Sequence, residues 1–89
     1  MQLGRVVGMV TGTVKDPSLS GHKLLLVNLV DASGTVVTTH QIVVDAVGAG
    51  TGDLVLVASG SAARQTATTR GSATDATAVA IIDEITTTD

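Results

Sequence analysis

The residues with the clearest chemical potential lie in a glycine-rich loop and the apolar run that follows it, within residues 45–64. Gly48, Gly50 and Gly52 occupy alternate positions, where glycine permits positive φ angles and close approach of another group. Glycine loops cradle phosphates when they open a helix with the spacing G-x-x-x-x-G-K-[ST] or G-x-G-x-x-G. This loop has neither spacing, and the acidic residue Asp53 follows it directly. We therefore expect a tight turn between strands rather than a nucleotide site.

Residues that could support catalysis or bind a metal are sparse. The sequence contains no cysteine, and neither His22 nor His40 has a histidine or carboxylate four residues away. No G-x-S-x-G nucleophile motif is present. Asp45 and Asp53 have no recognisable neighbour that would tune them as an acid and a base. We expect no catalytic residue, no metal site and no cofactor, and hence a protein that is not an enzyme.

The composition predicts a thin hydrophobic core. The chain has 89 residues and no Phe, Trp or Tyr, although 44% of it is hydrophobic. One domain of this size, residues 1–89, leaves much of its surface exposed. Because Val, Leu, Ile and Ala must pack the core without the large area that aromatic side chains bury, surplus apolar surface is expected to pack against identical subunits.

The charge argues against nucleic acid or an anionic membrane as a partner. The formal net charge is -3, and the basic residues are scattered at Arg5, Lys15, Lys23, Arg64 and Arg70. No apolar run approaches the roughly 18 residues that span a bilayer, and none resembles the apolar region of a secretory signal. The sequence favours an intracellular protein.

Short apolar segments bounded by turn residues predict an all-β fold. The expected strands are residues 3–14, 23–30, 36–44, 54–58 and 78–85. Glycines within the first strand mark bends or close backbone approaches. Residues 31–34 predict a hairpin turn, residues 65–74 a surface loop, and Ser72 with Asp75 the capping pattern of a short helical turn. We expect a mainly all-β, five-stranded, OB-like antiparallel β-barrel with one short helical turn.

A barrel of this kind leaves one alternative function open. OB-type modules bind small ligands, or bind oligonucleotides through aromatic side chains and a basic groove. The sequence supplies neither aromatics nor clustered basic residues. An OB-type ligand- or oligonucleotide-binding module is therefore the second hypothesis.

Four stretches carry a resemblance to a known family. They are L-G-R-V-V-G-M-V at 3–10, L-S-G-H-K-L-L-L-V at 19–27, D-A-V-G-A-G-T-G-D-L-V-L-V-A-S-G-S-A-A-R at 45–64, and D-A-T-A-V-A-I-I-D at 75–83. In this order they resemble the EutN/CcmL family of bacterial microcompartment shell proteins. The resemblance implies a structural homopentamer that caps shell vertices. It also implies hexameric or pseudohexameric shell proteins as partners and a place in the shell, within the bacterial cytoplasm.

The same resemblance suggests where subunits meet. Convergence of five loops near a symmetry axis would require small residues, and a plain turn between strands is the alternative reading. The candidates for the subunit interface or the region near the axis are Gly48, Ala49, Gly50, Gly52, Ser61, Ala62 and Arg64.

Charged residues give further candidates. Arg64 is expected either to pair with Asp45 or Asp53 of a neighbouring subunit or to remain solvated. Lys15 and Lys23 are candidate contacts to a hexameric shell protein.

Overall fold

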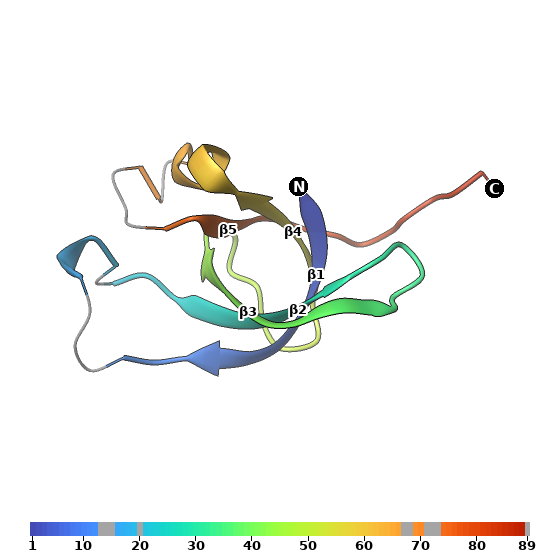
Figure 1. Ribbon diagram of the computed structural model, residues 1–89, viewed down its shortest axis with the longest axis horizontal. Helices are drawn as coiled ribbons and strands as arrows, with labels where there is room; N and C mark the ends of the chain where they lie inside the picture. Colours follow the sequence, from blue (N-terminus) through green and yellow to red (C-terminus); the bar gives the residue numbers. More distant parts are fainter. Residues whose placement is uncertain (13–15, 20, 67–68, 71–73, 89) are drawn as a thin grey trace.

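Five strands form a closed barrel in the computed structural model, which describes residues 1–12, 16–19, 21–66, 69–70 and 74–88. The order around the barrel is β1-β2-β3-β5-β4 (Figure 1). The strands are β1 (Gln2–Val10), β2 (Leu24–Val30), β3 (Val36–Asp45), β4 (Leu54–Ser59) and β5 (Ala76–Ile81). The predicted five-stranded barrel is confirmed.

One seam departs from the expected antiparallel pairing. β3 and β5 run parallel where Val44 pairs with Thr77 and Asp45 with Ala78. All other neighbours in the barrel pair antiparallel. β1 runs antiparallel to both β2 and β4. Since β3 is antiparallel to β2 and β5 is antiparallel to β4, β3 and β5 both run in the direction of β1 and are parallel where they pair.

The helical turn lies at a different place from the one the capping pattern predicted. The described residues include two short 3-10 helices, η1 (Pro17–Leu19) and η2 (Gly60–Arg64), and η2 lies between β4 and β5. Ser72 lies outside the described residues, and the residues after Asp75 form β5. The predicted helix start therefore falls outside the described residues, and the segment from Ala76 is extended because it pairs with β4.

Strand boundaries also differ at the ends of the chain. β1 ends at Val10 rather than continuing to residue 14, and residues 13–15 lie outside the described part. β5 begins two residues earlier than predicted and ends at Ile81. Among the described residues, no helix has the length and apolar content to cross a bilayer.

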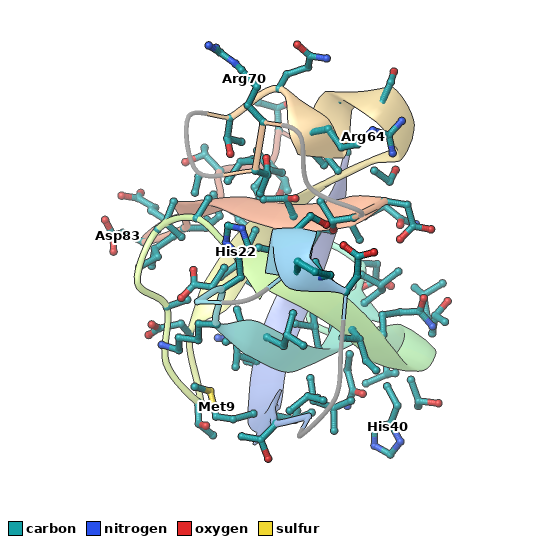
Figure 2. All side chains as sticks on the ribbon, turned by 90° about the vertical axis from the view of Figure 1, so that its left-hand side faces the viewer. Met9, His22, His40, Arg64, Arg70 and Asp83 are labelled. Atoms are coloured by element: carbon teal, nitrogen blue, oxygen red, sulfur yellow. The ribbon has the colours of Figure 1, made fainter. Side chains whose placement is uncertain are left out.

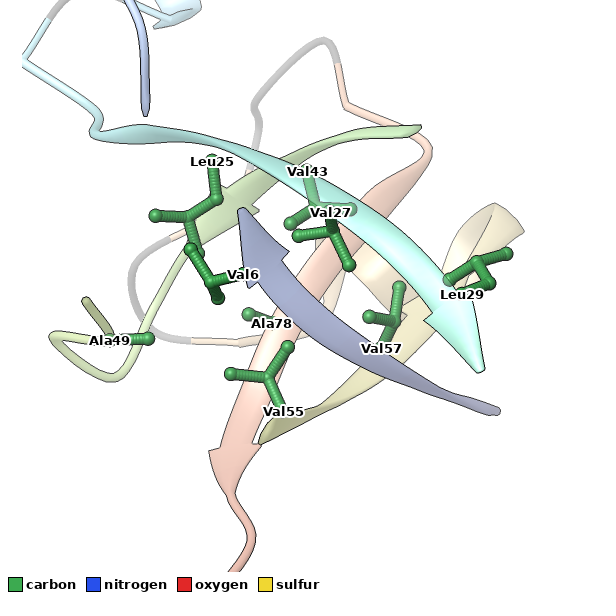
Figure 3. Packing of buried hydrophobic residues seen from close by; sticks show 9 residues of the cluster. All are labelled: Val6, Leu25, Val27, Leu29, Val43, Ala49, Val55, Val57 and Ala78. Atoms are coloured by element: carbon green, nitrogen blue, oxygen red, sulfur yellow. The ribbon is translucent and has the colours of Figure 1, made fainter. Parts of the chain in front are cut away.

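Small aliphatic side chains fill the barrel. Figure 3 shows the side chains of the core, which are Val6, Leu25, Val27, Leu29, Val43, Ala49, Val55, Val57 and Ala78. Gly4 faces this core. A Cβ atom at Gly4 would overlap Cγ1 of Val27 and lie 3.3 Å from Cγ2 of Val57. Glycine stands in this strand because neighbouring valines already occupy the space.

β1 bends at an irregularity in its pairing with β2. The register shifts between Val6 and Gly8, which leaves Val7 without a paired partner on β2. A bulge of this kind bends the strand. The β2-β3 hairpin extends beyond the barrel, and every residue from Asp31 to Ile42 is exposed (Figure 1).

Candidate functional site

The amides of the glycine loop are occupied by the loop's own carboxylates. Oδ1 of Asp45 accepts hydrogen bonds from the amides of Val47 and Gly48, both at 3.0 Å. Oδ2 of Asp53 accepts one from the amide of Gly50 at 2.8 Å. A phosphate cradle needs such amides free to bind an anion. The geometry therefore supports a self-contained turn, in agreement with the argument from spacing.

Two further contacts hold the loop against the barrel. The ammonium nitrogen of Lys23 lies 3.4 Å from Oδ2 of Asp45 and donates a hydrogen bond to the carbonyl of Ala49. The loop also pairs with β1, since the amide of Gly52 donates to the carbonyl of Val6 at 2.8 Å. The loop is thus a braced element of the subunit rather than an open lid.

These contacts bear on three expectations. The side chain of Asp45 is only 1% exposed within its own subunit, which does not favour its pairing with Arg64 of a neighbour. Ala49 is fully buried in the core of its own barrel, which does not favour a position of its methyl group at a symmetry axis. The ammonium of Lys23 binds within the subunit while its side chain is 38% exposed, and a contact of Lys23 with a shell partner stays a prediction. Lys15 lies outside the described residues.

Two glycines of the loop have positive φ angles. Gly48 has a φ of 77° and Gly52 a φ of 95°, a region that side chains rarely adopt. Both residues are exposed, and nothing lies within 4 Å of where their Cβ atoms would be. A role for Gly48, Gly50 and Gly52 near a symmetry axis stays a prediction.

The second turn is the 3-10 helix η2. Ser61 and Ala62 are exposed on it and stay candidates for a subunit contact. The guanidinium of Arg64 donates from Nη1 to the carbonyl of Thr74 at 2.9 Å. This hydrogen bond ties η2 to the start of β5 within the subunit. Arg64 is half-buried, and pairing with Asp53 of a neighbour stays a prediction.

Buried threonines hold the same turn, and the sequence argument missed them. The carbonyl of Ala63 accepts hydrogen bonds from the hydroxyls of Thr69 at 2.6 Å and Thr77 at 2.7 Å. Both threonines are fully buried. Thr69 belongs to the low-complexity stretch expected on the surface, so that expectation is wrong at this residue. A threonine flanked by small polar residues gives no sequence signal of burial.

The remaining titratable candidates lie apart. His22 follows η1, whereas His40 is on the projecting part of β3, and Figure 2 shows the two well separated. No group of three or more histidine, aspartate or glutamate residues within the described ranges is placed to hold a metal ion. Apolar side chains are exposed on the surface, including Ile42 and Val37 on β3, which are 54% and 65% exposed.

Comparison with known proteins finds a matching family and similar proteins. Residues 1–83 match the family described as "Ethanolamine utilisation protein EutN/carboxysome". The chain is 48% identical over 86 residues to the carboxysome shell vertex protein CcmL of Nostoc sp., a match that covers 96% of this chain and 85% of that protein. It is 45% identical to the microcompartment shell vertex protein GrpN of Rhodospirillum rubrum, with 96% of each protein covered.

A solved structure agrees with the fold over its whole length. The pentameric microcompartment shell protein GrpN from Rhodospirillum rubrum superposes with a TM-score of 0.89 at 44% identity, covering 99% of this chain and 100% of that one. CcmL of Gloeobacter violaceus superposes with a TM-score of 0.90 at 41% identity, covering 98% and 90%.

Proposed function

The chain belongs to the EutN/CcmL family, and on that premise we propose that it is a structural protein that caps vertices of a bacterial microcompartment shell as a homopentamer. The observation that carries this function is the full-length similarity to named shell vertex proteins, one of them solved as a pentamer. Family and relatives are structural proteins, so the chain is not an enzyme.

The physical chemistry of the subunit supports a ring. Its core contains no aromatic side chain, and Ile42 and Met9 are at least half exposed. Such surface is costly to leave in water and is buried by association. A contact that repeats around a closing rotation produces a ring of identical subunits.

A ring of five subunits fits the corners of a closed polyhedral shell. A flat sheet of hexagonal units cannot close into a polyhedron without fivefold corners. We therefore infer that the ring contacts hexameric or pseudohexameric shell proteins, and that it resides in the shell within the bacterial cytoplasm. The net charge of -3 supports protein partners over nucleic acid or anionic lipid.

Native mass spectrometry of the purified chain tests the assembly. We expect a pentamer at micromolar concentration, and a stable monomer or an even-numbered assembly would contradict it. Co-assembly with a hexameric shell protein tests the vertex role. Closed particles should form only when both proteins are present, whereas sheets or open tubes that persist after this chain is added would count against that role.

The OB-type binding module is the competing function. Fluorescence anisotropy with single-stranded DNA at physiological salt would support it if binding were tight. We expect no binding, because stacking aromatics, which contribute about 1–3 kcal/mol per base, are absent from the sequence.

A further inference from the structure

The barrel carries an apolar outer face centred on β2. Leu25 and Val27 point into the core (Figure 3), so Leu24 and Leu26 point outward because side chains alternate along a strand. Leu24 pairs with Val10, and Leu26 pairs with both Gly8 and Ile42. Gly8 has no side chain to cover Leu26. We call the face formed by Val10, Leu24, Leu26 and Ile42 the β2 face.

Ile42 is the most exposed member of this face. Its side chain is 54% exposed and borders a hollow of about 220 Å³ whose lining includes Leu19 and Leu24. Among the described residues, β5 pairs with β3 only at Val44 and Asp45. The β2 face therefore ends at an open strand edge, which a neighbouring surface can approach.

A second apolar outer face is centred on β4. Val55 and Val57 point inward (Figure 3), so Leu54 and Leu56 point outward. Leu56 pairs with Leu3 on one side and Ala80 on the other. We call the face formed by Leu3, Leu54, Leu56 and Ala80 the β4 face. Its members are half-buried in the isolated subunit.

The two faces use different residues and are centred on strands that are not neighbours. β1 lies between β2 and β4 in the barrel order. A closed ring with more than two members needs two different patches on each subunit, which meet head to tail, whereas a twofold dimer needs only one self-complementary patch. Two separate apolar faces on one small barrel meet the requirement of the ring.

We propose that the β2 face of each subunit packs against the β4 face of the next, with Ile42 against the surface around Leu56. This inference rests on the proposed pentamer and adds the surfaces that build it. The occupant of each face is a second copy of the chain, because the chain is similar over its full length to a pentameric protein and a ring of five is built from heterologous contacts.

The variants Ile42→Asp and Leu56→Asp test the two faces separately. A carboxylate buried in an apolar contact is strongly unfavourable. Each variant should run as a folded monomer by native mass spectrometry, with an unchanged far-ultraviolet circular dichroism spectrum. Val37→Asp is the matched control, because Val37 is also an exposed β3 residue but lies on neither face. It should stay pentameric, and loss of the pentamer in this control would overturn the assignment.

Mixing the two variants tests the head-to-tail arrangement. Ile42→Asp keeps an intact β4 face and Leu56→Asp an intact β2 face, so an equimolar mixture should form a one-to-one heterodimer that cannot extend. If each face instead contacted its own kind, two homodimers would form, and the proposal would be wrong.

A cysteine pair gives a second measurement if Leu56→Asp fails to fold. The chain has no native cysteine, so Ile42→Cys with Leu56→Cys should oxidise to a covalent ladder up to five subunits. If a pentameric sample gave only monomers after oxidation, the inference would be overturned and the proposed function would stand. A wild-type chain that is not pentameric would remove the proposed function itself.

Discussion

Lys23, which directly precedes β2, lies with its ammonium nitrogen 3.4 Å from Oδ2 of Asp45, the last residue of β3. The same ammonium donates a hydrogen bond to the carbonyl of Ala49 in the glycine loop. The other carboxylate oxygen of Asp45 binds the amides of Val47 and Gly48. One buried carboxylate thus links the end of β3 to the residue before β2 and orders the glycine loop that follows β3.

Replacing Asp45 should destabilise this arrangement to a degree that depends on the substitute. Asp45→Ala leaves two loop amides and one ammonium without an acceptor, and we expect a loss of about 2–4 kcal/mol in the free energy of unfolding. Asp45→Asn keeps an acceptor oxygen and should lose less. Chemical denaturation at matched protein concentration measures both, and equal losses would show that the amide hydrogen bonds contribute nothing.

Gly4→Ala should destabilise the core. Its Cβ atom would overlap Cγ1 of Val27, and overpacking of a core typically costs about 1–3 kcal/mol. Thermal unfolding measures the loss. Gly4→Ala combined with Val27→Ala should recover part of it, because the second change removes the overlapping methyl group. Additive losses in this double-mutant cycle would contradict the steric explanation.

Gly48→Ala should lower stability through its backbone alone. The φ of 77° costs an L-residue about 1–2 kcal/mol, although nothing lies within 4 Å of the added methyl group. Gly50→Ala is the matched control, because Gly50 has no positive φ and its Cβ atom would lie 4.0 Å from Oδ2 of Asp53. If both variants also lose the pentamer while the subunit stays folded, the loop lies in crowded surroundings near the axis.

Arg64→Ala should loosen the connection between η2 and β5, because it removes the hydrogen bond from Nη1 to the carbonyl of Thr74. Hydrogen exchange should show faster exchange of amides near Ala76. We also expect a weaker ring by size-exclusion chromatography at matched concentration. An unchanged pentamer would show that Arg64 is not part of the subunit interface and stabilises only the turn within its own subunit.

The hairpin turn after β2 should depend on pH. Hydrogen bonds from the Ser33 hydroxyl and the Thr35 amide hold the pKa of Asp31 below its ordinary value of 3.8. A lowered pKa means that these bonds favour the folded turn above pH 3.8, and that their contribution is lost as the pH falls through the pKa of the folded state. Carbon-13 NMR titration of the Asp31 carboxyl group should give a midpoint below 3.8. A midpoint at or above that value would contradict the prediction. As a control, Asp31→Asn should abolish the pH response of the Ser33 amide.

Local sequence patterns were sufficient for much of the fold. Short apolar segments bounded by turn residues placed β2, β3 and β4 to within one residue at each end, because apolar runs and turn chemistry are properties of neighbouring positions. The stretches at 3–10, 19–27, 45–64 and 75–83 were sufficient to indicate the family. The capping pattern did not indicate the helical turn η2, which lies at Gly60–Arg64, and the segment from Ala76 pairs with β4.

The sequence by itself determined that the chain forms a small aliphatic barrel with more apolar surface than one subunit can bury. Only the tertiary structure decided that Asp45 and Lys23 serve their own subunit, that Ala49 belongs to the core, and that Ile42 and Leu56 face outward. The reason is that these outcomes depend on strand register, on the shift between Val6 and Gly8 in β1, and on the path of the glycine loop across the barrel end. Each of these relates residues far apart in the chain, which no local pattern can specify.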